Sequence, residues 1–273
     1  MKPTPLDVTD RPHRLRLYGQ RPQGASAPLV LHFHGGHFDA GNLDSGRVVA
    51  QMLADAGALV ASIDYPLAPE HPFPAAAEAG YEALAWLQRQ RSKLAGAGST
   101  LWVAGEEAGG NLAAAVAMMA RDRREPPLAG QILLSPMLDP CLATASLRKA
   151  EAGKVGCRWA DGWHHYFAGR VLDGDHPYAA PARASRLADL PPTLLVTAHD
   201  DPLRDETRHY AKRLRAAGVA VQEVTLAGPT GWPCSFMDPA CGSAAWTAEL
   251  NEPLRRLLAT TPTPTPSIHA ARK

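Results

Sequence analysis

A glycine-rich turn with the sequence VAGEEAGGNLAAA, at residues 103–115, carries a carboxylate, Glu107, at its tip. The pattern is typical of a strand, a sharp turn and a helix, and in one large enzyme class the tip residue is a serine that attacks the substrate. A glutamate there permits three kinds of chemistry. It could attack a substrate covalently, exchange protons with a neighbouring histidine, or stay ionised against the N–H groups of the turn.

Three histidines are candidates for the second group that such chemistry needs. His37 lies in FHGGHF, residues 33–38, and His164 and His165 lie in a helical stretch at residues 158–172. A Glu107–His37 pair could move protons in a hydration, elimination or hydrolysis step. Nothing in the sequence fixes His164 and His165, so the simpler interpretation of that pair is two ordinary helix residues, one of them facing solvent.

Alternating strand and helix patterns must position these residues. Continuous apolar runs are typical of strands buried on both faces, and they occur at residues 28–36, 58–65, 100–105, 130–136, 192–198 and 219–226. Residues 15–20 fit an antiparallel edge strand, and residues 75–94 and 205–218 fit amphipathic helices. We therefore predict an α/β fold with a central, mostly parallel sheet of about eight strands flanked by helices.

The 273 residues are enough for one large domain, which we place at residues 1–259. Within it, residues 140–190 include about fifty residues without strand character, and we interpret this segment as a lid-like or cap-like insertion over the carboxyl ends of the strands. The Pro- and Thr-rich tail at residues 260–273 has little to bury, so we expect it to be flexible.

Composition excludes several classes of partner. The net charge of +1 gives no electrostatic case for nucleic acid or an acidic membrane surface. The four cysteines form neither a CxxC pair nor a Cys/His cluster with zinc spacing, so we expect free thiols, no metal and no cofactor. No apolar run fits a signal peptide or a bilayer span. These features predict a cytoplasmic protein.

Four motifs together resemble the hormone-sensitive-lipase-like esterases, a family of α/β-hydrolases. FHGGHF (33–38) resembles the family's oxyanion loop, DYPLAPEHPFPAA (64–76) a family-specific stretch, GEEAGGNLAAA (105–115) its nucleophile elbow, and DDPLRDETRHYAKRLRAAGV (200–219) its triad-acid segment. The resemblance covers residues 14–258 and implies the α/β-hydrolase fold. Members usually carry a helical cap before the first strands, so we expect a reduced N-terminal cap in this chain.

The family's mechanism uses a serine, an aspartate and a histidine in that chain order. The resemblance implies that Glu107 occupies the serine position and that Asp201 occupies the acid position. The histidine position falls on Gly231, and no histidine occurs at residues 210–268. Two of the three triad side chains are therefore different from those of the family.

The resemblance also implies an oxyanion hole built from the amides of Gly36, His37 and Ala108. His37 replaces the third glycine of the loop, so a positive φ there would be strained. The implied pocket is lined by His34, Phe38, Trp163, His164 and Tyr166. Among these, His34 is expected to brace the loops rather than to react.

Because the serine and histidine are absent, we expect a non-hydrolytic protein in which ordinary serine esterase activity is lost. It would bind a small, apolar or acyl-bearing ligand, or associate with a protein partner or a second copy of itself. In this interpretation the Glu107 carboxylate lies against the oxyanion amides and stays ionised. The alternative is a hydrolase or lyase with a Glu107-centred site for a small ester or acyl substrate. A third class is a purely structural subunit.

Overall fold

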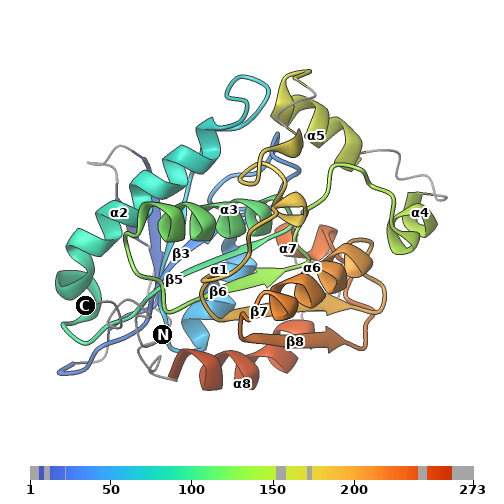
Figure 1. Cartoon of the computed structure of the whole chain (residues 1–273). Helices are drawn as coiled ribbons and strands as arrows, with labels where there is room; N and C mark the ends of the chain where they lie inside the picture. Colours follow the sequence, from blue (N-terminus) through green and yellow to red (C-terminus); the bar gives the residue numbers. More distant parts are fainter. Residues whose placement is uncertain are drawn as a thin grey trace, which may run out of the picture.

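The computed structural model describes residues 6–8, 13–21, 23–151, 158–170, 174–238 and 245–259. Its eight-stranded sheet has the order β1-β2-β4-β3-β5-β6-β7-β8, and helices flank it on both faces (Figure 1). The pairs β1–β2 and β2–β4 are antiparallel, and the other pairs are parallel. The predicted α/β fold with a mostly parallel sheet is therefore confirmed.

The elements alternate along the chain as the sequence pattern predicts. The strands are β1 (Leu6–Val8), β2 (Leu15–Tyr18), β3 (Leu29–Phe33), β4 (Leu59–Ile63), β5 (Leu101–Glu106), β6 (Gly130–Leu134), β7 (Thr193–Ala198) and β8 (Val221–Leu226). The helices are α1 (Arg47–Asp55), α2 (Ala75–Ala95), α3 (Ala108–Arg123), α4 (Ala145–Glu151), α5 (Arg158–Phe167), α6 (Arg204–Ala216), α7 (Cys234–Met237) and α8 (Ala245–Ala259). A 3-10 turn, η2, spans Pro181–Arg183.

The sheet separates two apolar cores because successive side chains of a strand point to opposite faces. In β3, Leu31 and Phe33 face the core covered by α2, α3, α5 and α6, whereas Val30 faces the core covered by α1, α7 and α8. The strands β3 to β7 are buried along their whole length, which is why they appear as continuous apolar runs.

The turn between β5 and α3 brings the helix close to the sheet. A Cβ on Gly109 would lie 2.1 Å from the carbonyl oxygen of Phe33, and one on Gly105 would lie 2.2 Å from the carbonyl oxygen of Gly109. Phe33 and Gly105 are partners in the parallel pair of β3 and β5. The residues that follow these two strands therefore meet at the carboxyl edge of the sheet, where parallel sheets commonly hold their sites.

Several other expectations can be compared with the structure. Helices α4 and α5 fall inside the expected insertion at residues 140–190, and the tail at residues 260–273 lies outside the described residues. Cys141 is a free, exposed thiol, but Cys234 is disulfide-bonded, so the expectation of four free thiols is wrong. Among the helices of the described segments, none has the length and apolar character to cross a membrane.

Candidate functional site

Glu107 lies at the tip of the β5–α3 turn in an uncommon backbone conformation. Its φ is 53° and its ψ is −116°, a region that L-residues rarely adopt. Two backbone hydrogen bonds hold it there: the Glu107 N–H donates to Leu134 O at 3.0 Å, and the Met137 N–H donates to Glu107 O at 2.9 Å. Strained residues held in this way cluster at functional sites.

The Glu107 carboxylate lies against the loop that follows β3. The N–H groups of Gly36 and His37 both donate to its Oε2, at 2.7 and 3.3 Å. These are two of the three amides expected to form the oxyanion hole, and the third, Ala108, is the fully buried first residue of α3. The φ of His37 is 56°, so this position adopts the positive φ that favours glycine.

The ring of His37 turns back onto the same carboxylate. Its Nε2 lies 2.9 Å from Oε1 of Glu107. The two side chains therefore form a close ion pair. Both side chains are buried, His37 at 7% and Glu107 at 1% exposure, and at such sites electrostatic interactions are weakly screened.

The two groups shift each other's proton affinity. Burial lowers the pKa of His37, but the Glu107 carboxylate outweighs burial and the net pKa is raised. Burial raises the pKa of Glu107, but the His37 ring and the amides of Gly36 and His37 outweigh it and the net pKa is lowered. Opposite charges in contact stabilise one another. The contact therefore favours a carboxylate beside an imidazolium.

Helix α5 packs against the loop that carries His37. The ring of Trp159 lies 6.2 Å from the ring of His37, edge on. Gly162 packs directly on the loop, since a Cβ there would lie 2.2 Å from the carbonyl oxygen of His37. His165 Nδ1 lies 2.7 Å from Oδ2 of Asp39, which ties the helix to the same loop. The expected lid segment thus includes a helix seated on the candidate site.

The residues predicted to line a pocket are divided between the interior and the surface. Phe38 stacks on Tyr166 at 4.0 Å and lies 5.0 Å from Trp163, and all three are buried. His34 is fully buried and its Nδ1 bonds Gly35 O at 2.7 Å, which fits the expected bracing role. His164 is exposed, so the structure does not bring it into this cluster.

Asp201, the predicted triad acid, is engaged by groups other than a histidine. Its carboxylate accepts hydrogen bonds from Ser135 Oγ at 2.7 Å, Thr197 Oγ1 at 2.6 Å and the Leu203 N–H at 2.9 Å. Burial outweighs these donors and raises its pKa to about 6. The triad-acid role of Asp201 stays a prediction.

Gly231, the predicted triad-histidine position, lies in a segment that is attached to Asp200. The Thr230 N–H donates to Asp200 Oδ2 at 2.7 Å, and the Gly231 N–H donates to the same oxygen at 3.4 Å. The Thr230 hydroxyl adds a third bond at 3.0 Å. These contacts fix the segment without a side chain at Gly231.

The sequence interpretation missed three polar residues beside the site. Glu106 Oε1 accepts from the Gly35 N–H at 3.1 Å, Glu106 Oε2 lies 2.8 Å from His32 Nε2, and His32 Nδ1 lies 2.9 Å from Ser62 Oγ. A signal was present, because His32 interrupts the apolar strand LVLHF and a buried polar side chain requires partners. The partners come from β4 and β5, which no local pattern identifies.

A second buried carboxylate, Glu206, makes stability depend on pH. It accepts from the Leu138 N–H at 2.6 Å, and burial raises its pKa from 4.5 to about 8. The folded state therefore keeps a proton that the unfolded chain releases. The contribution of this proton to the free energy of unfolding is complete below about pH 4. It falls by about 1.4 kcal/mol per pH unit as the pH rises towards 8.

Glu206→Gln keeps an acceptor for the Leu138 N–H but does not titrate. Between pH 6 and 7.5 we expect the wild type to lose about 2 kcal/mol more unfolding free energy than the variant. Urea unfolding at the two pH values measures both slopes. Glu252→Gln, on an exposed residue paired with Arg256, is the control and should keep the wild-type slope. Parallel slopes for Glu206→Gln and wild type would show that Glu206 does not titrate in this range.

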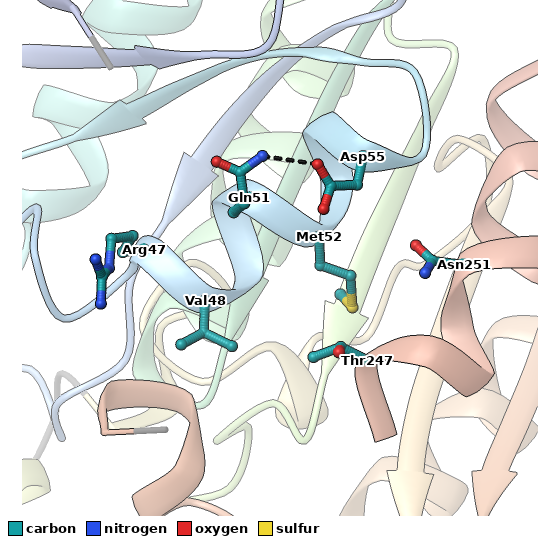
Figure 2. Close-up of a pocket in the computed structure, with 7 residues that line it drawn as sticks. All are labelled: Arg47, Val48, Gln51, Met52, Asp55, Thr247 and Asn251. Atoms are coloured by element: carbon teal, nitrogen blue, oxygen red, sulfur yellow. Dashed lines mark hydrogen bonds between the residues drawn. The ribbon is translucent and has the colours of Figure 1, made fainter. Parts of the chain in front are cut away.

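A surface pocket lies apart from this cluster. It has a volume of about 300 Å³ between α1 and α8, and its lining is Arg47, Val48, Gln51, Met52, Asp55, Thr247 and Asn251 (Figure 2). Gln51 donates to Asp55 across one helical turn at 2.8 Å. None of its lining residues belongs to the Glu107 cluster. In the described segments, no group of three or more His, Cys, Asp or Glu side chains could hold a metal ion.

Comparison with known proteins finds that this chain is similar to proteins named as ester hydrolases. Residues 30–230 match the model of a family described as alpha/beta hydrolase fold. The chain is 40% identical over 206 residues to Esterase LipI of Mycobacterium tuberculosis, which covers 74% of this chain and 64% of LipI. It is 38% identical over 221 residues to Carboxylesterase NlhH of the same species, covering 79% of this chain and 68% of NlhH. The chain thus spans about two thirds of the length of these relatives.

A solved structure of an esterase has a similar fold. The crystal structure of esterase LipW from Mycobacterium marinum superposes with a TM-score of 0.80 at 34% identity, covering 94% of this chain and 82% of LipW. These findings overturn the expectation of a non-hydrolytic protein without ordinary esterase activity, since the relatives carry the names of ester hydrolases. The expectation rested on the absent serine and histidine.

Proposed function

The chain belongs to the α/β-hydrolase fold family, and we propose that it hydrolyses small carboxylic esters with the Glu107–His37 pair as its proton-transfer groups. The observation that carries the proposal is the 2.9 Å contact between His37 Nε2 and Glu107 Oε1. The ester class rests on the relatives named esterase and carboxylesterase. The buried aromatic cluster of Phe38, Trp163 and Tyr166, which begins at the residue after His37, favours an apolar acyl group.

In the proposed reaction, a water molecule attacks the ester carbonyl carbon. Both backbone N–H groups that bind this carboxylate in the described part of the chain donate to Oε2, and Oε1 of Glu107 accepts the proton that this water loses. The His37 imidazolium donates a proton to the departing alkoxide, and its positive charge favours the oxyanion that precedes this step. The acyl–oxygen bond breaks, and the products are the acid and the alcohol.

The pair then returns to its starting state without another group. After the reaction Glu107 holds a proton and His37 is neutral. Burial favours this neutral pair, but the contact between the two groups outweighs burial and favours the charged pair, so the proton passes from Oε1 to Nε2 across 2.9 Å. The cycle needs only water and the ester. Since Glu107 is 1% exposed, the ester reaches it only when the residues that bury it move aside.

His37→Gln tests the proposal. The variant keeps a polar side chain but cannot donate a proton as an acid, so kcat for ethyl acetate, whose alkoxide must be protonated as it leaves, should fall about 100-fold. The pH profile of wild-type kcat/KM should be bell-shaped, falling on the acid side as Glu107 is protonated and on the alkaline side above the ordinary pKa range of histidine.

The matched control is His209→Gln, on an exposed residue of α6. It should keep wild-type kcat. Equal kcat values for His37→Gln and the wild type, in preparations with equal folded fraction, would show that His37 takes no part in the reaction. The identity of the ester, any oligomeric or protein partner and the cytoplasmic location stay predictions.

A further inference from the structure

A buried chain of three polar side chains joins three neighbouring strands beside the site. It consists of Ser62 on β4, His32 on β3 and Glu106 on β5, and it ends on the Gly35 N–H. A neutral imidazole with its proton on Nε2 can donate a hydrogen bond to Glu106 and accept one at Nδ1 from the Ser62 hydroxyl. Both ring nitrogens are then satisfied. A fully satisfied buried network rigidifies its surroundings.

The chain contains a serine, a histidine and a carboxylate, but it is not itself a place for substrate. All three residues are 0% exposed and lie within the sheet. The start of α1 closes the position further, because a Cβ on Gly46 would lie 3.0 Å from Cε1 of His32. No ester can approach Ser62 without opening the sheet, so a role in positioning is the physical one.

Two adjacent carboxylates bind three successive amides of one loop. Glu106 binds the Gly35 N–H at 3.1 Å, and Glu107 binds the N–H groups of Gly36 and His37 at 2.7 and 3.3 Å. The loop cannot shift relative to Glu107 without also breaking the Glu106 contact. Since His37 belongs to this loop, the distance between its ring and Glu107 depends on where Gly35 is held.

We propose that the Ser62–His32–Glu106 chain is a positioning device, which anchors the Gly35–His37 loop so that His37 faces Glu107. The catalytic readout of this proposal rests on the ester hydrolysis proposed above. The hydrogen bonds of Glu106, rather than its charge, hold the loop in place. In Glu106→Gln the amide oxygen can still accept from Gly35, and the amide nitrogen can donate to His32 Nε2 if the ring proton moves to Nδ1 and donates to Ser62. In Glu106→Ala both contacts are lost.

The experiment compares Glu106→Ala, Glu106→Gln and Ser62→Ala with the wild type. A shift of the loop by about 1 Å should lower kcat of Glu106→Ala about 100-fold with KM changed less than about 3-fold. Glu106→Gln should restore kcat to within about 5-fold of the wild type. Ser62→Ala removes only the far end of the chain, so it should fold even where Glu106→Ala does not, and its kcat should fall about 5-fold.

A second readout does not depend on ester hydrolysis. The histidine ring protons of His37, identified in NMR spectra by their absence in His37→Gln, report its titration. In Glu106→Ala, or in Ser62→Ala to a smaller extent, the pKa of His37 should fall from its raised value because Glu107 is no longer in contact. If no ester is hydrolysed by the wild type, the proposed function fails, while this titration still tests the positioning device.

Ser99→Ala is the matched control. Ser99 is also a buried hydroxyl, 3% exposed, but it donates to Gly96 O at 2.6 Å, away from the site. It should leave kcat and the His37 titration unchanged. A folded Glu106→Ala or Ser62→Ala with wild-type kcat and wild-type His37 titration would overturn the proposal. A loss of kcat in Glu106→Gln as large as in Glu106→Ala would also overturn the proposal, because the charge of Glu106 rather than its hydrogen bonds would then determine kcat.

Discussion

Glu107→Gln is expected to lower kcat/KM for p-nitrophenyl acetate about 1000-fold, a loss of about 4 kcal/mol in transition-state stabilisation. Glutamine has the size of glutamate, and its amide oxygen can still accept from the Gly36 N–H, which lies 2.7 Å from Oε2 in the wild type. It cannot take a proton from water, and it does not hold His37 in the charged form. One substitution therefore removes the base and weakens the acid.

Glu78→Gln is the control for this variant. Glu78 is 44% exposed on α2 and pairs with Arg123 at 2.7 Å, so the same chemical change there should leave kcat/KM at the wild-type value. Circular dichroism and urea unfolding establish that both variants are folded. If Glu107→Gln retained a third or more of wild-type kcat/KM, the carboxylate could not be the proton acceptor.

Gly109→Ala is expected to destabilise the fold by about 4 kcal/mol or more, the range of the most damaging single substitutions. The added Cβ would lie 2.1 Å from Phe33 O and 2.4 Å from His34 O, both backbone atoms of the strand and loop that hold the site. Neither can move without separating α3 from β3. Urea or thermal unfolding measures the loss.

Gly174→Ala provides the comparison for this stability effect. Gly174 is also buried, but in the described part of the chain the nearest atom to an added Cβ is 3.6 Å away, an ordinary contact. We expect a change within about 1 kcal/mol. Equal losses for the two variants would mean that burial of the glycine, rather than close approach of the backbone, determines the cost.

The strands and the turn at Glu107 were predictable from the sequence because their causes are local. Buried parallel strands need continuous apolar residues, and the β5–α3 turn needs small residues at Gly105 and Gly109, so both leave a pattern in a few consecutive letters. The contact of the Glu107 carboxylate with the Gly36 and His37 amides followed from the resemblance of two motifs.

The rest of the site depends on contacts between distant parts of the chain. The ring of His37 could point to Glu107 or away from it, and only the loop geometry and the cover of α5 decide this. The chain through His32 and Ser62 joins residues 30 positions apart, and Glu106 lies 74 positions from His32. The sequence predicts the Glu107–His37 pair only as an alternative, because the missing triad serine and histidine are visible in the sequence and the contact within the pair is not.

A single turnover in H₂¹⁸O, with enzyme in excess over p-nitrophenyl acetate, tests the central claim most directly. If the Glu107–His37 pair directs water onto the ester, mass spectrometry should find one ¹⁸O in the released acetate and none in the peptide that contains Glu107. No release of acetate above the rate in buffer, or ¹⁸O in the Glu107 carboxylate, would contradict the account.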